Sequence, residues 1–387
     1  LTGTSHMIVG HDGSVTFRAS GHTFNSTSGR YALESLYIDG RDLEGAATAV
    51  VSVSDTVEMA ITSLHVVSGE MRPSGAVAVL STLVNISVGG KITGKARGYA
   101  HQSGPGWGGA GSGHYRAAGS HGGVGGVEAV GAMYGSTFEP VLPGSGGYEG
   151  IGGAAIRLES DTLILDGTID MDGQTTSGGA GAGGSVYIRT RLLEGSTSGV
   201  ISTRGGAGTA SNNRGDQYYQ GSNGGGGGRI ALYCSESTHL DNFSGFANVP
   251  SMVAHGGADA LTTVEREGGA GTMYIACGGA NRTLVLHGNG YGRTTNLVDT
   301  GMTTYVFDHL HLYGAAKLGF DPVNVSSSLV TVSIGSTGGD RSGELLVDAN
   351  VRTLVQSSLA GPFAFDSSYQ TGDSSLIASA GEALEMQ

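Results

Sequence analysis

Lysine, proline and long apolar runs are nearly missing from this 387-residue sequence. Only three lysines occur (Lys91, Lys95 and Lys317), and 33 acidic residues against 20 Lys and Arg give a net charge of −13. Because no basic run exists, we expect neither nucleic acid nor an anionic membrane as a partner. No stretch approaches the ~18 apolar residues of a membrane helix, so we expect no membrane span. Seven prolines and glycine without a strict period of three exclude collagen.

Glycine is abundant instead. The chain contains 72 glycines, yet hydrophobic residues still make up 38% of it. A disordered low-complexity chain would hold fewer Val, Ile and Leu. We therefore expect a buried aliphatic core with the glycine concentrated outside it. The chain begins at Leu1 without an apolar signal region, which is typical of a mature chain or a fragment whose targeting signal has been removed.

A repeat underlies this composition. Five small residues act as anchors, and an apolar residue follows each anchor after two and after four positions. The anchors are Gly75, Ala154, Gly184, Gly228 and Gly271, and the apolar pairs are Val77/Val79, Ile156/Leu158, Val186/Ile188, Ile230/Leu232 and Met273/Ile275. Alternation with a period of two is typical of a strand with one buried face. Its recurrence predicts that the copies stack on one another.

These patterns predict an all-β fold, a right-handed parallel β-helix (solenoid) with long Gly-rich loops on one side. Successive coils would stack at about 4.8 Å, and neighbours would bury each other's apolar faces. We divide the chain into N-terminal β coils (1–74), Gly-rich solenoid repeats (75–290), and C-terminal β coils with a tail (291–387). An antiparallel β-sandwich over residues 1–95 is the alternative for the N-terminal part, because a period of two suits both folds.

The glycine is concentrated in connections that follow the same point of the repeat, within 98–150, 175–184, 205–228 and 255–271. Connections at one point of a solenoid coil leave the stack on one side. Several tyrosines lie in them, and glycine lets backbones approach closely. We expect these loops to pack together and to dock on neighbouring subunits. The alternative is a solvated decoration.

Cys234 and Cys277 are the only cysteines, and each lies six residues after its anchor. The equivalent positions of the other copies hold Ser81, Ser160 and Thr190. Adjacent coils would place such residues about one strand spacing apart, inside the roughly 4.4–6.8 Å between Cα atoms that a disulfide needs. We therefore predict a Cys234–Cys277 disulfide and an oxidising compartment. Two unrelated free thiols are the alternative.

Five Asn-x-Ser/Thr sequons predict N-linked glycosylation and, with it, an extracellular or cell-surface location. They are Asn25, Asn85, Asn242, Asn281 and Asn324. None of them has proline at the middle position.

No residue is predicted to be catalytic. Asp170 and Asp172 share a strand face, as a glycosidase carboxylate pair would. We interpret them as a solvated outward face with no basic residue beside them. Asp170-Met171-Asp172-Gly173 resembles half of a calcium loop but lacks the bidentate Glu. We therefore predict no metal site and no cofactor besides N-linked glycans, with a calcium ion as the alternative. Arg214-Gly215-Asp216 spells an adhesion tripeptide, which chance explains in so Gly-rich a chain.

The segments GGSVYIRT (183–190), GGGGGRIALY (224–233) and GGAGTMYIA (268–276) resemble the Gly-rich repeats of large surface proteins of protists and bacteria. Those proteins resemble parallel β-helix adhesins and coat or fibre components, and the match covers roughly residues 75–290. The resemblance implies an extracellular structural role, in flagellar-hair-like or cell-surface filaments.

The function expected from these observations is a non-enzymatic structural subunit of a glycosylated extracellular filament or surface coat. Such a subunit would self-assemble head to tail into a helical homopolymer, and other surface glycoproteins or glycans are further partners. A surface adhesin or carbohydrate-binding module is the first alternative. A β-helix enzyme that degrades polysaccharides is the second.

Overall fold

The structure is a computed structural model. It describes residues 7–9, 14–17, 20–25, 29–40, 49–107, 109, 116–126, 131–209, 223–237, 251–259, 266–278, 281–288, 290, 293–320, 330–340, 342–346, 351–355, 364–366 and 376–378. All regular secondary structure in these ranges is β-strand. No helix there is long and apolar enough to cross a membrane.

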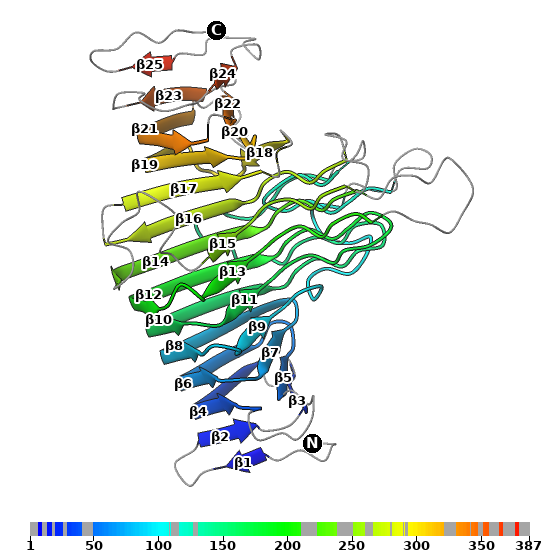
Figure 1. Ribbon diagram of the computed structural model, residues 1–387, viewed down its shortest axis with the longest axis vertical. Coiled ribbons are helices and arrows are strands. Elements are labelled where there is room, and N and C mark those ends of the chain that lie inside the picture. The colour runs from blue at the N-terminus through cyan, green and yellow to red at the C-terminus, as the bar shows by residue number, and fades with distance from the viewer. Residues whose placement is uncertain are drawn as a thin grey trace, which may run out of the picture.

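The strands form one long stack in nearly sequential order (Figure 1). A 14-stranded sheet, called here the long-strand sheet, extends from one end of the stack to the other. Its strands are β1 (Met7–Val9), β2 (Ser14–Phe17), β4 (Arg30–Ile38), β6 (Glu58–Val66), β8 (Ala76–Ile86), β10 (Ala155–Leu165), β12 (Ser185–Gly195), β14 (Arg229–Ser237), β16 (Thr272–Cys277), β17 (Asn281–His287), β19 (Thr304–Tyr313), β21 (Val330–Gly339), β23 (Val351–Val355) and β25 (Leu376–Ala378).

Two sheets of short strands accompany it. The first belongs to the N-terminal part and contains β3 (Ser20–Phe24), β5 (Val50–Val53), β7 (Glu70–Pro73), β9 (Lys91–Thr93), β11 (Thr168–Asp170), β13 (Val200–Ser202) and β15 (Ser251–Val253). The second belongs to the C-terminal part and contains β18 (Thr294–Leu297), β20 (Lys317–Phe320), β22 (Glu344–Leu346) and β24 (Ala364–Asp366). From β2 to β16, and again from β17 to β25, long and short strands alternate along the chain, so these coils contain one strand of each kind.

The long strands bend in the middle. In β8, Val77 and Val79 are buried in the first half of the strand, and Val84 and Ile86 are buried in the second half. The buried side chains therefore occupy odd-numbered positions before the middle of the strand and even-numbered positions after it. Thr82 marks the change, because the register between β8 and β10 passes over it. The alternation of the sequence therefore describes two short runs that both face the core, with a polar corner between them.

The predicted columns are confirmed. Val186 is paired with Ile230, and Ile230 with Met273, in consecutive parallel strand pairs. All three side chains belong to one continuous cluster of buried residues. Strands β4, β6 and β8 are also parallel, so the alternative of an antiparallel sandwich over residues 1–95 is wrong. The parallel β-solenoid is confirmed, while its right-handed sense and the boundaries at residues 74 and 290 stay predictions.

One feature of the fold was not predicted: the chain reverses direction between β16 and β17. These two strands pair antiparallel, and β17, β19, β21, β23 and β25 then pair parallel to one another. Met273 and Val285 contribute to the first core, whereas Tyr274 and Leu284 contribute to a second core on the opposite face of the same sheet. The C-terminal coils therefore pack on the other side of the long-strand sheet.

Candidate functional site

Four segments connect a short strand to the next long strand and carry most of the glycine; we call them the glycine excursions. They comprise residues 94–154, 171–184, 203–228 and 254–271. Figure 1 shows their described parts leaving the stack on one side and extending next to one another. The prediction that the Gly-rich loops share one side of the solenoid is therefore confirmed.

Backbone hydrogen bonds join the excursions into a bundle. Gly123 N donates to Gly227 O at 2.8 Å, Gly183 N donates to Gly226 O at 2.9 Å, and Gly227 N donates to Gly269 O at 3.0 Å. Each of these bonds links two different excursions. The prediction that the loops pack together is confirmed, and their docking on neighbouring subunits stays a prediction.

The glycine of this bundle lies outside the aliphatic core, as expected, but it is buried rather than exposed to solvent. Gly183, Gly226 and Gly227 are buried. A Cβ atom added at Gly226 would lie within 3.0 Å of Gly123 O, and one at Gly183 within 3.0 Å of Thr203 O, closer than real Cβ atoms come. The backbone itself fills the interior here, because only glycine lets chains approach so closely. The molecule thus has an interior of backbone beside its aliphatic core.

Buried hydrogen bonds of Arg229 join the first excursion to the long-strand sheet. Arg229 of β14 is fully buried there, with its Nε donating to Tyr134 O at 3.0 Å. Its Nη1 donates to the hydroxyls of Thr137 and Thr272. Burial lowers the pKa of Arg229 to about 10, so the guanidinium stays charged at neutral pH. Asp299, which favours that charge, also accepts a hydrogen bond from Thr137 N.

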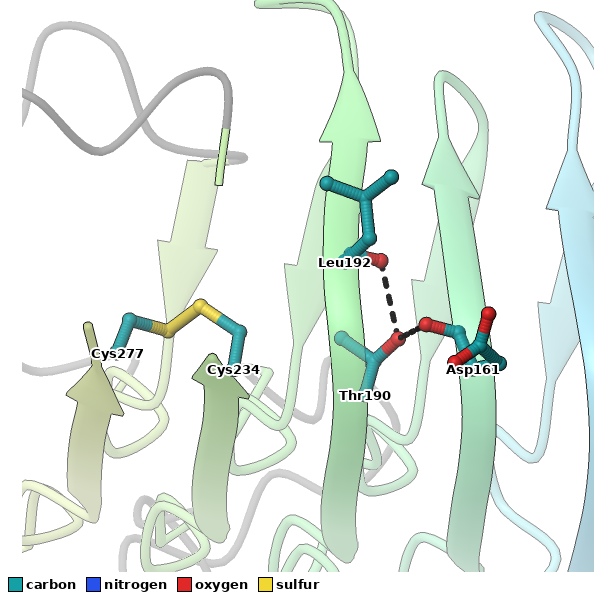
Figure 2. The surroundings of a disulfide bond; sticks show 5 residues. All are labelled: Asp161, Thr190, Leu192, Cys234 and Cys277. Atoms are coloured by element: carbon teal, nitrogen blue, oxygen red, sulfur yellow. Dashed lines mark hydrogen bonds between the residues drawn. A yellow bond between two sulfur atoms is a disulfide. The ribbon is translucent and has the colours of Figure 1, made fainter. Parts of the chain in front are cut away.

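The predicted disulfide is present. Figure 2 shows Cys234 and Cys277 bridging adjacent strands, with 4.4 Å between their Cα atoms. They continue a column of register-equivalent positions occupied by Ser81, Ser160 and Thr190. The Thr190 hydroxyl lies 3.0 Å from Leu192 O and 3.2 Å from Asp161 O (Figure 2).

The sequons differ in their surroundings. Asn25 and Asn281 are exposed, and Asn281 is the first residue of β17. Asn85 is half-buried in β8, where Ser87 Oγ lies 3.3 Å from its Oδ1. Asn242 and Asn324 lie outside the described residues, as does the tripeptide 214–216. Glycosylation of all five asparagines stays a prediction.

The interpretation of Asp170 and Asp172 as a solvated pair without a basic neighbour is wrong. Asp172 is only 4% exposed, and its Oδ2 lies 2.9 Å from Arg204 Nη2. Arg204 N and the Ser202 hydroxyl donate to its Oδ1. Burial raises the pKa of Asp170, and the neighbouring Asp172 carboxylate adds to this rise. Sequence reasoning missed Arg204 because it lies 32 residues from Asp172 and approaches only through coil stacking.

Asp172 and Arg204 belong to a row of polar residues, called here the ladder, at the foot of the glycine bundle, where the glycine excursions begin after the short strands. Lys95, Asp172, Arg204 and His255 each lie two residues after a short strand, namely β9, β11, β13 and β15. Those strands pair in register, so the ladder has one member per coil. All four residues line one pocket of about 480 Å³, together with Glu267 of the last excursion.

Burial lowers the pKa of His255 below its usual value, so its ring is neutral at neutral pH. Glu267 is 1% exposed, and burial raises its pKa to about 7, with the Asp259 carboxylate adding to the rise. No group of three or more His, Cys, Asp or Glu in the described part of the chain is placed to hold a metal ion. The pocket thus combines two basic side chains, the Asp172 carboxylate, a neutral imidazole and a carboxyl group whose pKa is raised to about 7.

Comparison of the chain with protein-family models, with curated proteins and with solved structures found no match.

Proposed function

We propose that this chain is a non-catalytic structural subunit of an extracellular filament or cell-surface coat, assembling head to tail. The observation that carries the proposal is the long-strand sheet, which extends through the whole stack (Figure 1). Within the described residues, its terminal strands β1 and β25 each pair with a single strand. An edge strand offers backbone groups to a further strand. A head-to-tail contact that does not close forms a filament.

Three further features support an extracellular role. The Cys234–Cys277 disulfide indicates an oxidising environment. Asn25 and Asn281 are exposed, as glycan acceptors must be. The Gly-rich repeats resemble those of protist and bacterial surface proteins.

A non-catalytic role is favoured because hydrogen bonds from Arg204 and Ser202 occupy both carboxylate oxygens of Asp172, so this carboxylate is not free to act on a substrate.

Blocking one end of the stack tests the assembly. Ile377→Pro places proline in the terminal strand β25, where its ring and missing amide oppose strand addition. We expect the parent chain to form regular fibres in negative-stain electron microscopy and this variant to remain monomeric in analytical ultracentrifugation. Val88→Pro is the matched control, since Val88 is exposed in a tight turn before Gly89, which has a φ of 89°. Proline suits such a position.

Circular dichroism of both variants checks that the fold persists. Dispersed monomers of the parent chain at every concentration and salt condition would contradict the proposal. So would fibres of the Ile377→Pro variant indistinguishable from those of the parent.

A further inference from the structure

The pocket at the foot of the glycine bundle has the properties of a ligand site. Its volume of about 480 Å³ is within the range of roughly 300–1,000 Å³ typical of small-ligand sites. The ladder Lys95, Asp172, Arg204 and His255 forms one wall, with members about 4.8 Å apart along the axis. This wall therefore spans four coils, which suits an elongated ligand lying along the stack.

The basic side chains of the ladder have donor groups that can still bind a ligand. Arg204 binds Asp172 through Nε and Nη2, which leaves Nη1 for another acceptor, and 47% of its side chain is exposed. Lys95 is exposed on the same wall. Asp172 is fully engaged by Arg204 and Ser202, so Lys95 and Nη1 of Arg204 are the donors that this wall offers to a ligand. A ligand with an anionic group fits these two donors.

Glu267 supplies the second, independent observation. The backbone amide of Asp259 donates to its carboxyl group. Its Oε2 is buried and has no hydrogen-bond partner among the described residues. Buried polar atoms nearly always have partners. Because Glu267 is one of the residues that line the pocket, its unpartnered oxygen indicates a group that binds there. A hydroxyl is suitable, because it can both donate to a carboxyl oxygen and accept from a carboxylic acid.

We propose that this pocket binds an acidic saccharide, whose carboxylate lies between Lys95 and Arg204 and whose hydroxyl group contacts Glu267. A divalent cation alone fits worse, because Lys95 and Arg204 would repel it. A ligand bearing an anionic group but no hydroxyls would leave Glu267 Oε2 without a partner. Uronic acid units carry both groups, and a chain of them can follow the ladder. The site goes beyond filament assembly and does not depend on it.

The affinity depends on pH through Glu267, whose pKa is about 7. The Asp259 carboxylate acts on Glu267 directly, and Lys95, Arg204, His255 and the Asp172 carboxylate line the same pocket. Below pH 7 the carboxyl group is protonated and does not repel an anionic ligand; above pH 7 it is charged and does. His255 stays neutral over most of this range because burial lowers its pKa. Binding is therefore tighter at pH 6 than at pH 8.

Isothermal titration calorimetry of the full chain tests the site, with a galacturonic acid trimer as probe and maltotriose as its neutral control. We expect heat of binding with the acidic trimer only. Lys95→Met weakens binding about tenfold or more, as the loss of a charged hydrogen bond predicts. Lys91→Met, an exposed lysine of the same coil that does not line the pocket, leaves it within about twofold, which is less than the effect of one typical hydrogen bond.

Glu267→Gln keeps the shape of the side chain without its charge. We expect this variant to bind the acidic trimer at pH 8 as tightly as the parent does at pH 6, with little change between the two. Equal affinity for the acidic and neutral trimers, or no binding of either at millimolar concentration, overturns the assignment. So does an equal loss in Lys91→Met and Lys95→Met. The titration uses soluble chain, so a failure to form fibres leaves its result unaffected.

Discussion

At the scale of single residues, one column of the long-strand sheet shows how a polar corner is stabilised. Ser81 Oγ lies 2.8 Å from Leu83 O, and the Thr190 hydroxyl occupies the equivalent place two coils later. The hydroxyls bind carbonyl oxygens next to Thr82 and Arg191, the positions that the strand register passes over. Cys234 and Cys277 end this column next to the chain reversal, where a covalent bond replaces the hydrogen bonds.

Removing this disulfide tests its contribution. The double substitution Cys234→Ser and Cys277→Ser keeps small polar side chains at the corner but opens a loop of 43 residues. The chain-entropy model gives a loss of up to about 4 kcal/mol in the free energy of unfolding. We expect a lower urea midpoint for the double variant and for the reduced parent chain, monitored by circular dichroism. Reductant should leave the double variant unchanged, and a parent chain insensitive to reductant would contradict the prediction.

At the scale of elements, the glycine excursions are stabilised by backbone rather than by side chains. Gly226 N donates to Gly119 O at 2.9 Å, while its own carbonyl accepts from Gly183 N. Gly226 therefore joins three excursions at one residue. Any side chain here would separate chains that now touch, which explains why these segments consist so largely of glycine.

Two alanine substitutions distinguish this role from the ordinary conformational role of glycine. Gly226→Ala places a methyl group against Gly123 O, and we expect overpacking to cost about 3 kcal/mol. Gly89→Ala is the control: Gly89 has no atom within 4 Å of an added Cβ, and only its φ of 89° opposes the change, at a cost of about 1 kcal/mol. Urea denaturation and limited proteolysis measure both. Equal effects of the two substitutions would show that close packing is not what requires glycine in the bundle.

At the scale of the whole molecule, one sheet carries two cores on opposite faces. Leu163 belongs to the first core, which the N-terminal coils form, and Leu310 belongs to the second core, which the C-terminal coils form. Both are fully buried. In a solenoid each coil contacts mainly its neighbours, so stability is nearly a sum of local contributions. The two halves should therefore respond separately to damage.

Hydrogen exchange measured by mass spectrometry tests this separation. Leu310→Ala should cost about 2–5 kcal/mol locally and speed exchange in β19 and β21, while β8 and β10 keep their protection. Leu163→Ala should give the reverse pattern. Loss of protection along the entire stack in either variant would mean that the two cores unfold as one unit.

Several features followed from the sequence alone because they depend on local alternation and on equivalence between copies. The pairs Val186/Ile188 and Ile230/Leu232 predicted strands with one buried face, and the common offset of Cys234 and Cys277 predicted their bond. Both inferences require only that coils stack in register, which the repeated pattern already implies. The common side of the glycine excursions follows from the same reasoning.

Other features were decided only by the tertiary structure. A period of two is the same in parallel and antiparallel strands, so nothing in the sequence marked the reversal between β16 and β17. The approach of Arg204 to Asp172, and of Arg229 to Tyr134, joins residues far apart in the chain that only stacking brings together. Glycine carries no side-chain pattern, so its place in a buried backbone bundle depends on how closely neighbouring chains approach, which only the folded arrangement decides.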